Sequence, residues 1–301
     1  MSGTSARTAL SKERRLGLAM ISPTLAVMVV VAGFPILYAV WLSLHQYSVQ
    51  TPGLSRWAPP YGLGNYADAL KSDDFWAAFT TTIVFTVISV FLELVLGLVM
   101  ALIMNAFARG KALLRAVVLV PWSVLTVVTA VMWRSVFDPS LGFVNTVLGV
   151  VGLPHDVVWL GQSPQALIVM IVADVWKTAP FMALLLLAGL QGIPREMHEA
   201  AAVDGADGWR EFWRITLPLL RPAILVALIF RTLDALRIFD LPYVLTKGAY
   251  GTDTLSLMSF RTLQQNGNIG LGSALAVITF IIVMAFSVVY IRLMRPGQEL
   301  R

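Results

Sequence analysis

The sequence has no cysteine and only three histidines among its 301 residues. It therefore has no disulfide, no thiolate metal site and no thiol nucleophile. His45, His155 and His198 lie far apart in the sequence and do not have the spacing of metal ligands. The phosphate-binding pattern Gly-x-x-x-x-Gly-Lys-Ser/Thr and the zinc-protease pattern His-Glu-x-x-His are also absent. We expect neither a metal nor a cofactor in this chain, and no catalytic site.

Charged residues are also scarce, at 13% of the chain, whereas 57% is hydrophobic. With a mean hydropathy of +0.77, the chain is too apolar for a soluble domain of this size. The net charge of +5 could favour nucleic acid, but the basic residues are scattered between apolar segments. Membrane topology explains them better, so we expect a lipid bilayer and no nucleic acid as partner.

Apolar segments of the length that crosses a hydrocarbon core, about 20 residues, occur six times. They predict an all-α polytopic membrane protein with one domain, residues 16–295, between tails at 1–15 and 296–301. The first segment is too long for a signal-peptide core and should be retained. The six segments are Leu16–Leu44, Phe75–Phe107, Leu113–Phe137, Ala166–Leu190, Pro222–Leu245 and Gly270–Met294.

The loops between these segments differ in charge. Most of the 22 Lys and Arg residues lie in the two tails, in the loop around residue 110 and in the loop 193–222. By the positive-inside rule, these parts and both termini are cytoplasmic. The opposite loops at 47–74 and 138–165 are long, and the second contains an expected short apolar helix, Phe143–Val151.

The loop 193–222 is polar and has a clear helical design. Pro194 suits the first position of a helix, where a missing N–H has no cost. Gly205 is placed to end that helix, because glycine adopts the left-handed conformation without a Cβ penalty. Asp207 can cap a second helix, Gly208–Thr216, which we expect to end at Leu217–Pro218.

This loop resembles the EAA loop of ABC importer permeases, in the form found in carbohydrate permeases. The resemblance rests on Glu199-Ala200-Ala201, on Asp204-Gly205 and on the downstream Ile215-Thr216-Leu217-Pro218. In that family the loop docks on the ATP-hydrolysing subunit. The resemblance therefore implies that Glu199, Ala200, Ala201, Asp204 and Gly205 couple this chain to an ATPase.

The resemblance extends over nearly the whole chain and is closest to trehalose permeases, more loosely to maltose-type ones. At Lys247–Tyr250 the sequence differs from the pattern common in the carbohydrate permeases. It implies the type I ABC importer permease fold and uptake of a disaccharide or small oligosaccharide by alternating access in a bacterial-type cytoplasmic membrane. It also implies a second permease, an ABC ATPase dimer that binds ATP and Mg²⁺, and an extracytoplasmic sugar-binding protein. The landmarks are 62–66, 74–76, 96–98, 142–145, 175–182, 230–235 and 239–246.

Charged side chains lie within the apolar segments, where each costs about 2.5–3.5 kcal/mol at a helix centre. They must face protein, one another or water. Two interpretations remain open: a sugar-binding vestibule, or buried ion pairs that fix helix packing. By resemblance to sugar permeases the candidate pathway residues are Asp174, Lys177, Thr178, Phe181, Arg231, Asp234 and Ala235, with Glu93 the weakest candidate.

A proton-coupled secondary transporter is the alternative function. Glu93, Asp174 and Asp234 would form its proton relay. Inverted repeats between the two halves would favour it, and we find none. The EAA loop also opposes it.

Overall fold

The computed structural model describes residues 16, 18–49, 60–106 and 111–294, and over these residues it is helical, with no β-strand beyond isolated bridges. The expected tails at 1–15 and 296–301 lie outside the described residues. Five helical segments of the described residues are long and apolar enough to cross a membrane. They confirm five of the six expected spans. Their bounds are Leu18–Ser43, which includes α2 (Phe34–Ser43), α4 (Asp73–Ala106), α8 (Gln165–Gln191), Gly208–Leu245, which includes α11 (Leu217–Ala235), and α14 (Ile269–Met294).

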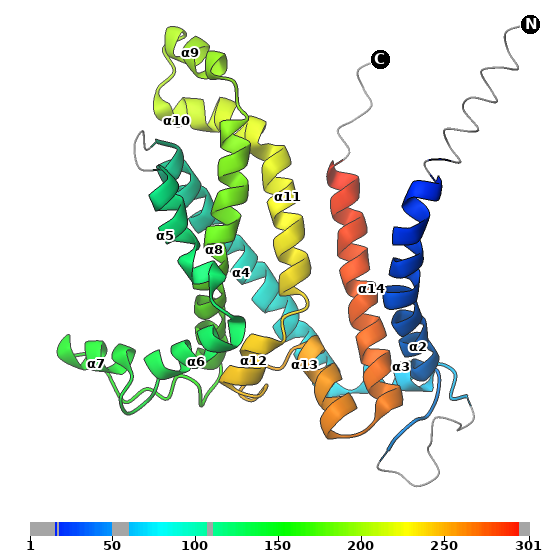
Figure 1. The fold of residues 1–301 in the computed structure, drawn as a ribbon. Helices are drawn as coiled ribbons and strands as arrows, with labels where there is room; N and C mark the ends of the chain where they lie inside the picture. Colours follow the sequence, from blue (N-terminus) through cyan, green and yellow to red (C-terminus); the bar gives the residue numbers. More distant parts are fainter. Residues whose placement is uncertain (1–15, 17, 50–59, 107–110, 295–301) are drawn as a thin grey trace, which may run out of the picture.

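The expected span Leu113–Phe137 is not one straight helix. It consists of α5 (Lys111–Ser123) and α6 (Thr126–Val136), which meet at an angle of 84°. Pro121 near the end of α5 has no N–H to continue the helix, and Leu125 is extended, with φ −57° and ψ 137°. Figure 1 shows α6 running across the direction of α8 rather than along it. The expected third span is therefore a bent pair of helices.

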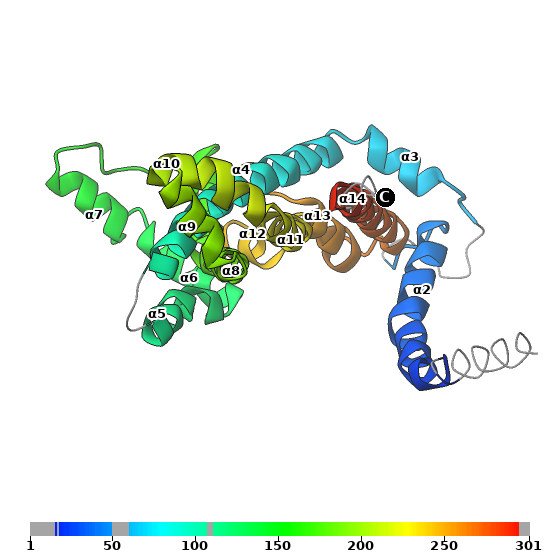
Figure 2. The ribbon, with the colours of Figure 1, turned by 90° about the horizontal axis from the view of Figure 1, so that it is seen from above.

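Helix α8 forms the centre of the bundle and packs against α4 and α11. In the most apolar stretch of α8, 61% of the residues are buried inside the bundle. In the first long helix the buried share of the corresponding stretch is 6%, and this helix lies at the periphery beside α14 (Figure 2). Two glycines allow the close packing. A Cβ on Gly97 of α4 would lie 2.7 Å from Met182 Cγ of α8, and a Cβ on Gly189 of α8 would clash with the Ala223 Cβ of α11.

Short helices cover the two ends of the bundle. At one end, α9 (Arg195–Val203) projects beyond α8 and α10 (Gly208–Glu211) (Figure 1). At the other end lie α6 and the remaining short helices. The expected helix Phe143–Val151 is confirmed among them as α7. They are α3 (Gly64–Lys71), α7 (Phe143–Val150), α12 (Asp240–Leu245) and α13 (Leu255–Phe260).

Candidate functional site

The projecting helix α9 ends as the sequence predicts. Gly205 has φ +72°, and Ala206 N–H donates to the Ala201 carbonyl at 2.9 Å. Gly205 N–H donates to the Ala202 carbonyl at 3.1 Å. These two bonds form a Schellman motif, which satisfies the last carbonyls of the helix. At the other end of α9, Pro194 is the N-cap rather than the first helical residue, one position from the prediction.

The second helix of this loop is longer than predicted. Asp207 caps it as expected, accepting from Arg210 N–H at 2.8 Å. The helix does not end at Leu217–Pro218 but passes through a π-helical turn, Phe212–Thr216, into α11. In this turn the N–H of Leu217 donates to the Phe212 carbonyl, five residues back. Because the turn is wider and Pro218 lies near the start of α11, the proline is accommodated without a break.

The candidate coupling residues divide by exposure. Glu199, Ala200, Asp204 and Gly205 are exposed, whereas Ala201 is 4% exposed and supports the helix from inside. A contact that sequence reasoning missed holds α9 in place: His198 Nδ1 lies 2.5 Å from Glu211 Oε1 of α10. The exposed face of α9 is therefore presented on a fixed support.

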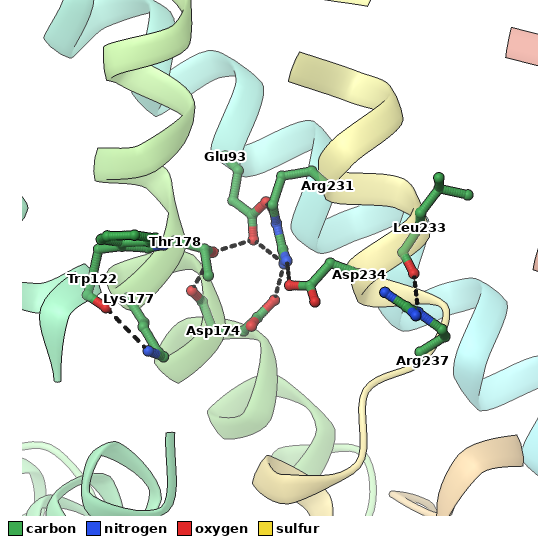
Figure 3. Close-up of polar contacts among 9 residues, drawn as sticks. All are labelled: Glu93, Trp122, Asp174, Lys177, Thr178, Arg231, Leu233, Asp234 and Arg237. Carbon is green, nitrogen blue, oxygen red and sulfur yellow. Dashed lines mark hydrogen bonds and ion pairs between the residues drawn. The ribbon is translucent and has the colours of Figure 1, made fainter. Parts of the chain in front are cut away.

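Inside the bundle, Arg231 of α11 binds three carboxylates (Figure 3). It makes a bidentate pair with Glu93, through Nε and Oε2 and through Nη2 and Oε1, the latter at 2.8 Å. Its Nη2 also donates to Asp174 Oδ2 and its Nη1 to Asp234 Oδ2, both at 2.6 Å. We call these four residues the Arg231 network.

Burial separates the members of the Arg231 network. The side chains of Glu93, Arg231 and Asp174 are 0%, 3% and 9% exposed, whereas that of Asp234 is 69% exposed. The buried three come from α4, α11 and α8, so the network joins the three central helices. Glu93, the weakest candidate from sequence, is the most deeply buried member of the network. Asp234 is the member that faces outward from it.

The remaining candidates lie in different surroundings. The Thr178 hydroxyl lies 2.7 Å from Glu93 Oε1 and 2.6 Å from the Asp174 carbonyl. Ala235 is 1% exposed and lies in the apolar core. Lys177 and Phe181 contact the bend between α5 and α6, so the candidates on α8 point in two directions.

At the bend, Lys177 holds the broken helix. Its Nζ donates to the carbonyls of Trp122 at 3.3 Å and Val124 at 2.6 Å. Carbonyls at the end of a helix have no partner within it, so the lysine satisfies groups that the break leaves free. The Phe181 ring stacks on the Trp122 ring, with centroids 5.3 Å apart and an interplanar angle of 11°.

The described residues thus form a polytopic helical membrane bundle with a helical loop projecting from one end. Residues 93–295 match the family model described as binding-protein-dependent transport system inner membrane component. The chain belongs to this family.

Two curated relatives share the full length of the chain. It is 44% identical to the trehalose/maltose transport system permease protein MalF of Thermococcus litoralis, over 96% of each chain. It is 42% identical to the trehalose transport system permease protein SugA of Mycobacterium tuberculosis, over 95% of this chain and 92% of the other. These matches confirm the predicted family and its trehalose/maltose branch.

A solved structure has the same fold. A chain of a bacterial ABC transporter involved in import of the acidic polysaccharide alginate aligns with a TM-score of 0.81 at 24% identity, covering 96% of this chain and 98% of the other. The type I importer permease fold expected from sequence is thereby confirmed. The protein is a multi-pass membrane transport subunit.

Proposed function

We propose that this chain is the permease subunit of an ATP-driven sugar importer, and that it carries a disaccharide or small oligosaccharide, with trehalose first and maltose-type sugars next. The relatives at 44% and 42% identity are a trehalose/maltose and a trehalose transport system permease protein, which supports this substrate class. The membrane is a bacterial-type cytoplasmic membrane, with α9 and both termini on the cytoplasmic side.

The importer needs further subunits, because the chain has no phosphate-binding loop of its own. We propose a second permease, a dimer of ABC ATPases and an extracytoplasmic sugar-binding protein. ATP and Mg²⁺ bind to the ATPases. A transporter with the same fold was solved in complex with a periplasmic protein bound to an alginate pentasaccharide, which supports the last of these partners.

The observation that carries the proposal is the continuous helix from the coupling loop into the Arg231 network. Between Gly208 and Arg231 the chain stays helical, which at 1.5 Å per residue is about 35 Å. A displacement of α9 is transmitted along this helix to the Arg231 network, which joins α4, α8 and α11. Closure of the ATPases thus turns the bundle from inward-open to outward-open.

For the substrate pathway we propose unequal roles. Asp234, Lys177 and Phe181 have accessible side-chain surface and would contact sugar hydroxyls and ring faces. Glu93, Asp174, Thr178 and Arg231 are buried, and Arg231 fixes the position of the Asp234 carboxylate. Ala235 fills the core beside them.

Reconstituted vesicles that contain the assembled complex test the proposal. Gly205→Pro should abolish ATP-dependent uptake of labelled trehalose and maltose, because proline cannot adopt a φ of +72°. Gly208→Ala is the control: Gly208 has open space for a Cβ and no left-handed φ, so its uptake should persist. Asp234→Asn should change the relative uptake of the two sugars. Uptake that continues without ATP and follows a pH gradient would instead establish a proton-coupled transporter that uses Glu93, Asp174 and Asp234.

A further inference from the structure

A cavity of about 360 Å³ lies between the end of α11, α13 and α14. Arg237, Ser256, Ser259, Thr279 and Phe280 are among its lining residues. It shares none of these residues with the Arg231 network. Figure 3 shows Arg237 apart from the network, with its drawn contact directed to Leu233. The cavity is within the size range of small-molecule sites.

Arg237 is an exposed arginine within a membrane-spanning segment, Gly208–Leu245. Its Nε donates to the Leu233 carbonyl at 3.1 Å, and no carboxylate of the described residues lies within ion-pair distance. An arginine has five N–H donors and is always charged. Only its Nε is used by the contact with Leu233, so the guanidinium N–H groups at Nη1 and Nη2 are available to a polar ligand.

The remaining lining residues have the chemistry of a carbohydrate site. Ser259 and Thr279 donate to the carbonyls of Gly272 and Leu275, at 3.0 Å and 2.9 Å, so each hydroxyl oxygen keeps lone pairs that can accept. The Ser256 hydroxyl has no hydrogen bond to any described residue. The Phe280 side chain is 47% exposed and offers an apolar ring. Donors, acceptors and a flat ring together match a sugar's hydroxyls and ring face.

We propose that this cavity is a second sugar subsite of the transporter, in which Arg237 and the hydroxyls of Ser256, Ser259 and Thr279 bind the hydroxyls of a neutral sugar. The inference rests on the proposed function as a sugar permease. The competing occupant of Arg237 is a carboxylate of the second permease subunit, and the experiments separate the two.

The first experiment measures ATP-dependent trehalose uptake, with maltose in parallel, by the complete complex in vesicles. Arg237→Gln should raise the KM for the transported sugar about tenfold, because a charge-assisted hydrogen bond is lost, while the complex still assembles. Arg292→Gln, at the far end of α14, removes the same charge outside the cavity and should leave the KM unchanged.

The second experiment uses the absence of cysteine from this chain. Ser256→Cys introduces the only thiol of this chain into the cavity, and its labelling by a small thiol reagent is followed on this subunit. Saturating transported sugar should slow the labelling several-fold. Ser140→Cys, on an exposed outer turn, should be labelled equally fast with and without sugar.

The outcomes are distinguishable. If the wild-type complex takes up neither sugar with ATP, the proposed function fails and the subsite fails with it. If uptake is normal but Arg237→Gln leaves the KM unchanged and sugar does not protect the thiol, the subsite alone is refuted. If Arg237→Gln instead releases the second permease from the purified complex, with no protection by sugar, Arg237 is an interface residue and the subsite is wrong.

Discussion

Removal of the positive charge of Arg231 should destabilise the bundle strongly. Arg231→Gln leaves the carboxylates of Glu93 and Asp174, at 0% and 9% exposure, without a cation between α4, α8 and α11. Breaking a buried ion pair by removing one partner typically costs about 3–5 kcal/mol, because the remaining charge stays buried without compensation. We expect a loss of that size in the free energy of unfolding.

The measurement is reversible unfolding of the whole chain in bicelles by increasing mole fractions of SDS, followed by tryptophan fluorescence. A second substitution provides the sharper test. On the Arg231→Gln background, Glu93→Gln removes a carboxylate that no longer has a partner. It should therefore recover about 1–3 kcal/mol of the loss, the size of the interaction free energy between neighbouring residues.

Arg292→Gln is the matched control, since it removes an exposed arginine from the end of α14. Its effect should stay within about 0.5 kcal/mol. If Glu93→Gln made the Arg231→Gln protein still less stable, or if Arg231→Gln cost no more than the control, the Arg231 network would not hold the three helices together.

Three further substitutions test other contacts. Gly189→Ala should destabilise the protein by about 1–3 kcal/mol in the same titration, because its Cβ would clash with Ala223, and adding Ala223→Gly should restore stability. Burial raises the pKa of Asp253 from 3.8 to about 6 although Arg261 opposes the shift, so stability should fall by up to about 3 kcal/mol as the pH rises from 4 to 7. Asp253→Asn should remove that slope, and a slope that persisted would show that another group titrates. Lys177→Met should broaden the distribution of distances between spin labels on α5 and α6, measured by pulsed electron paramagnetic resonance, because the hydrogen bonds to the carbonyls at the bend are lost. Lys177→Arg should preserve the wild-type distribution. Equal distributions in the two variants would mean that the lysine does not hold the bend.

The structure of the loop 193–222 is predicted well from the sequence because local rules decide it. A glycine at position 205 is needed for the left-handed turn, and an aspartate at 207 accepts from the N–H of Arg210, the third residue of the next helix. Neither depends on a residue far away. The same local rules misjudge Leu217–Pro218, because proline is tolerated near a helix start and the preceding π-helical turn is not visible in the pattern.

Long-range contacts explain what the sequence could not show. Glu93 looked the least promising of the candidates, yet its partner Arg231 lies 138 residues away in the chain. The break between α5 and α6 lies within a continuous apolar run, and the lysine that holds its carbonyls comes from α8, 53 residues away from Val124. Hydropathy measures composition and cannot report such partners.

The bend between α5 and α6 also determines on which face of the membrane the chain ends. Five crossings would leave the start of the first long helix and the end of α14 on opposite faces, but Figure 1 shows both at the same end as α9. An even number is therefore required, and α5 with α6 must complete the sixth crossing. Helix α5 alone is only about 20 Å long, shorter than the hydrocarbon core of about 30 Å. The sixth crossing is therefore made by two short helices at an angle, and its geometry depends on the hydrogen bonds that Lys177 of α8 donates at the bend.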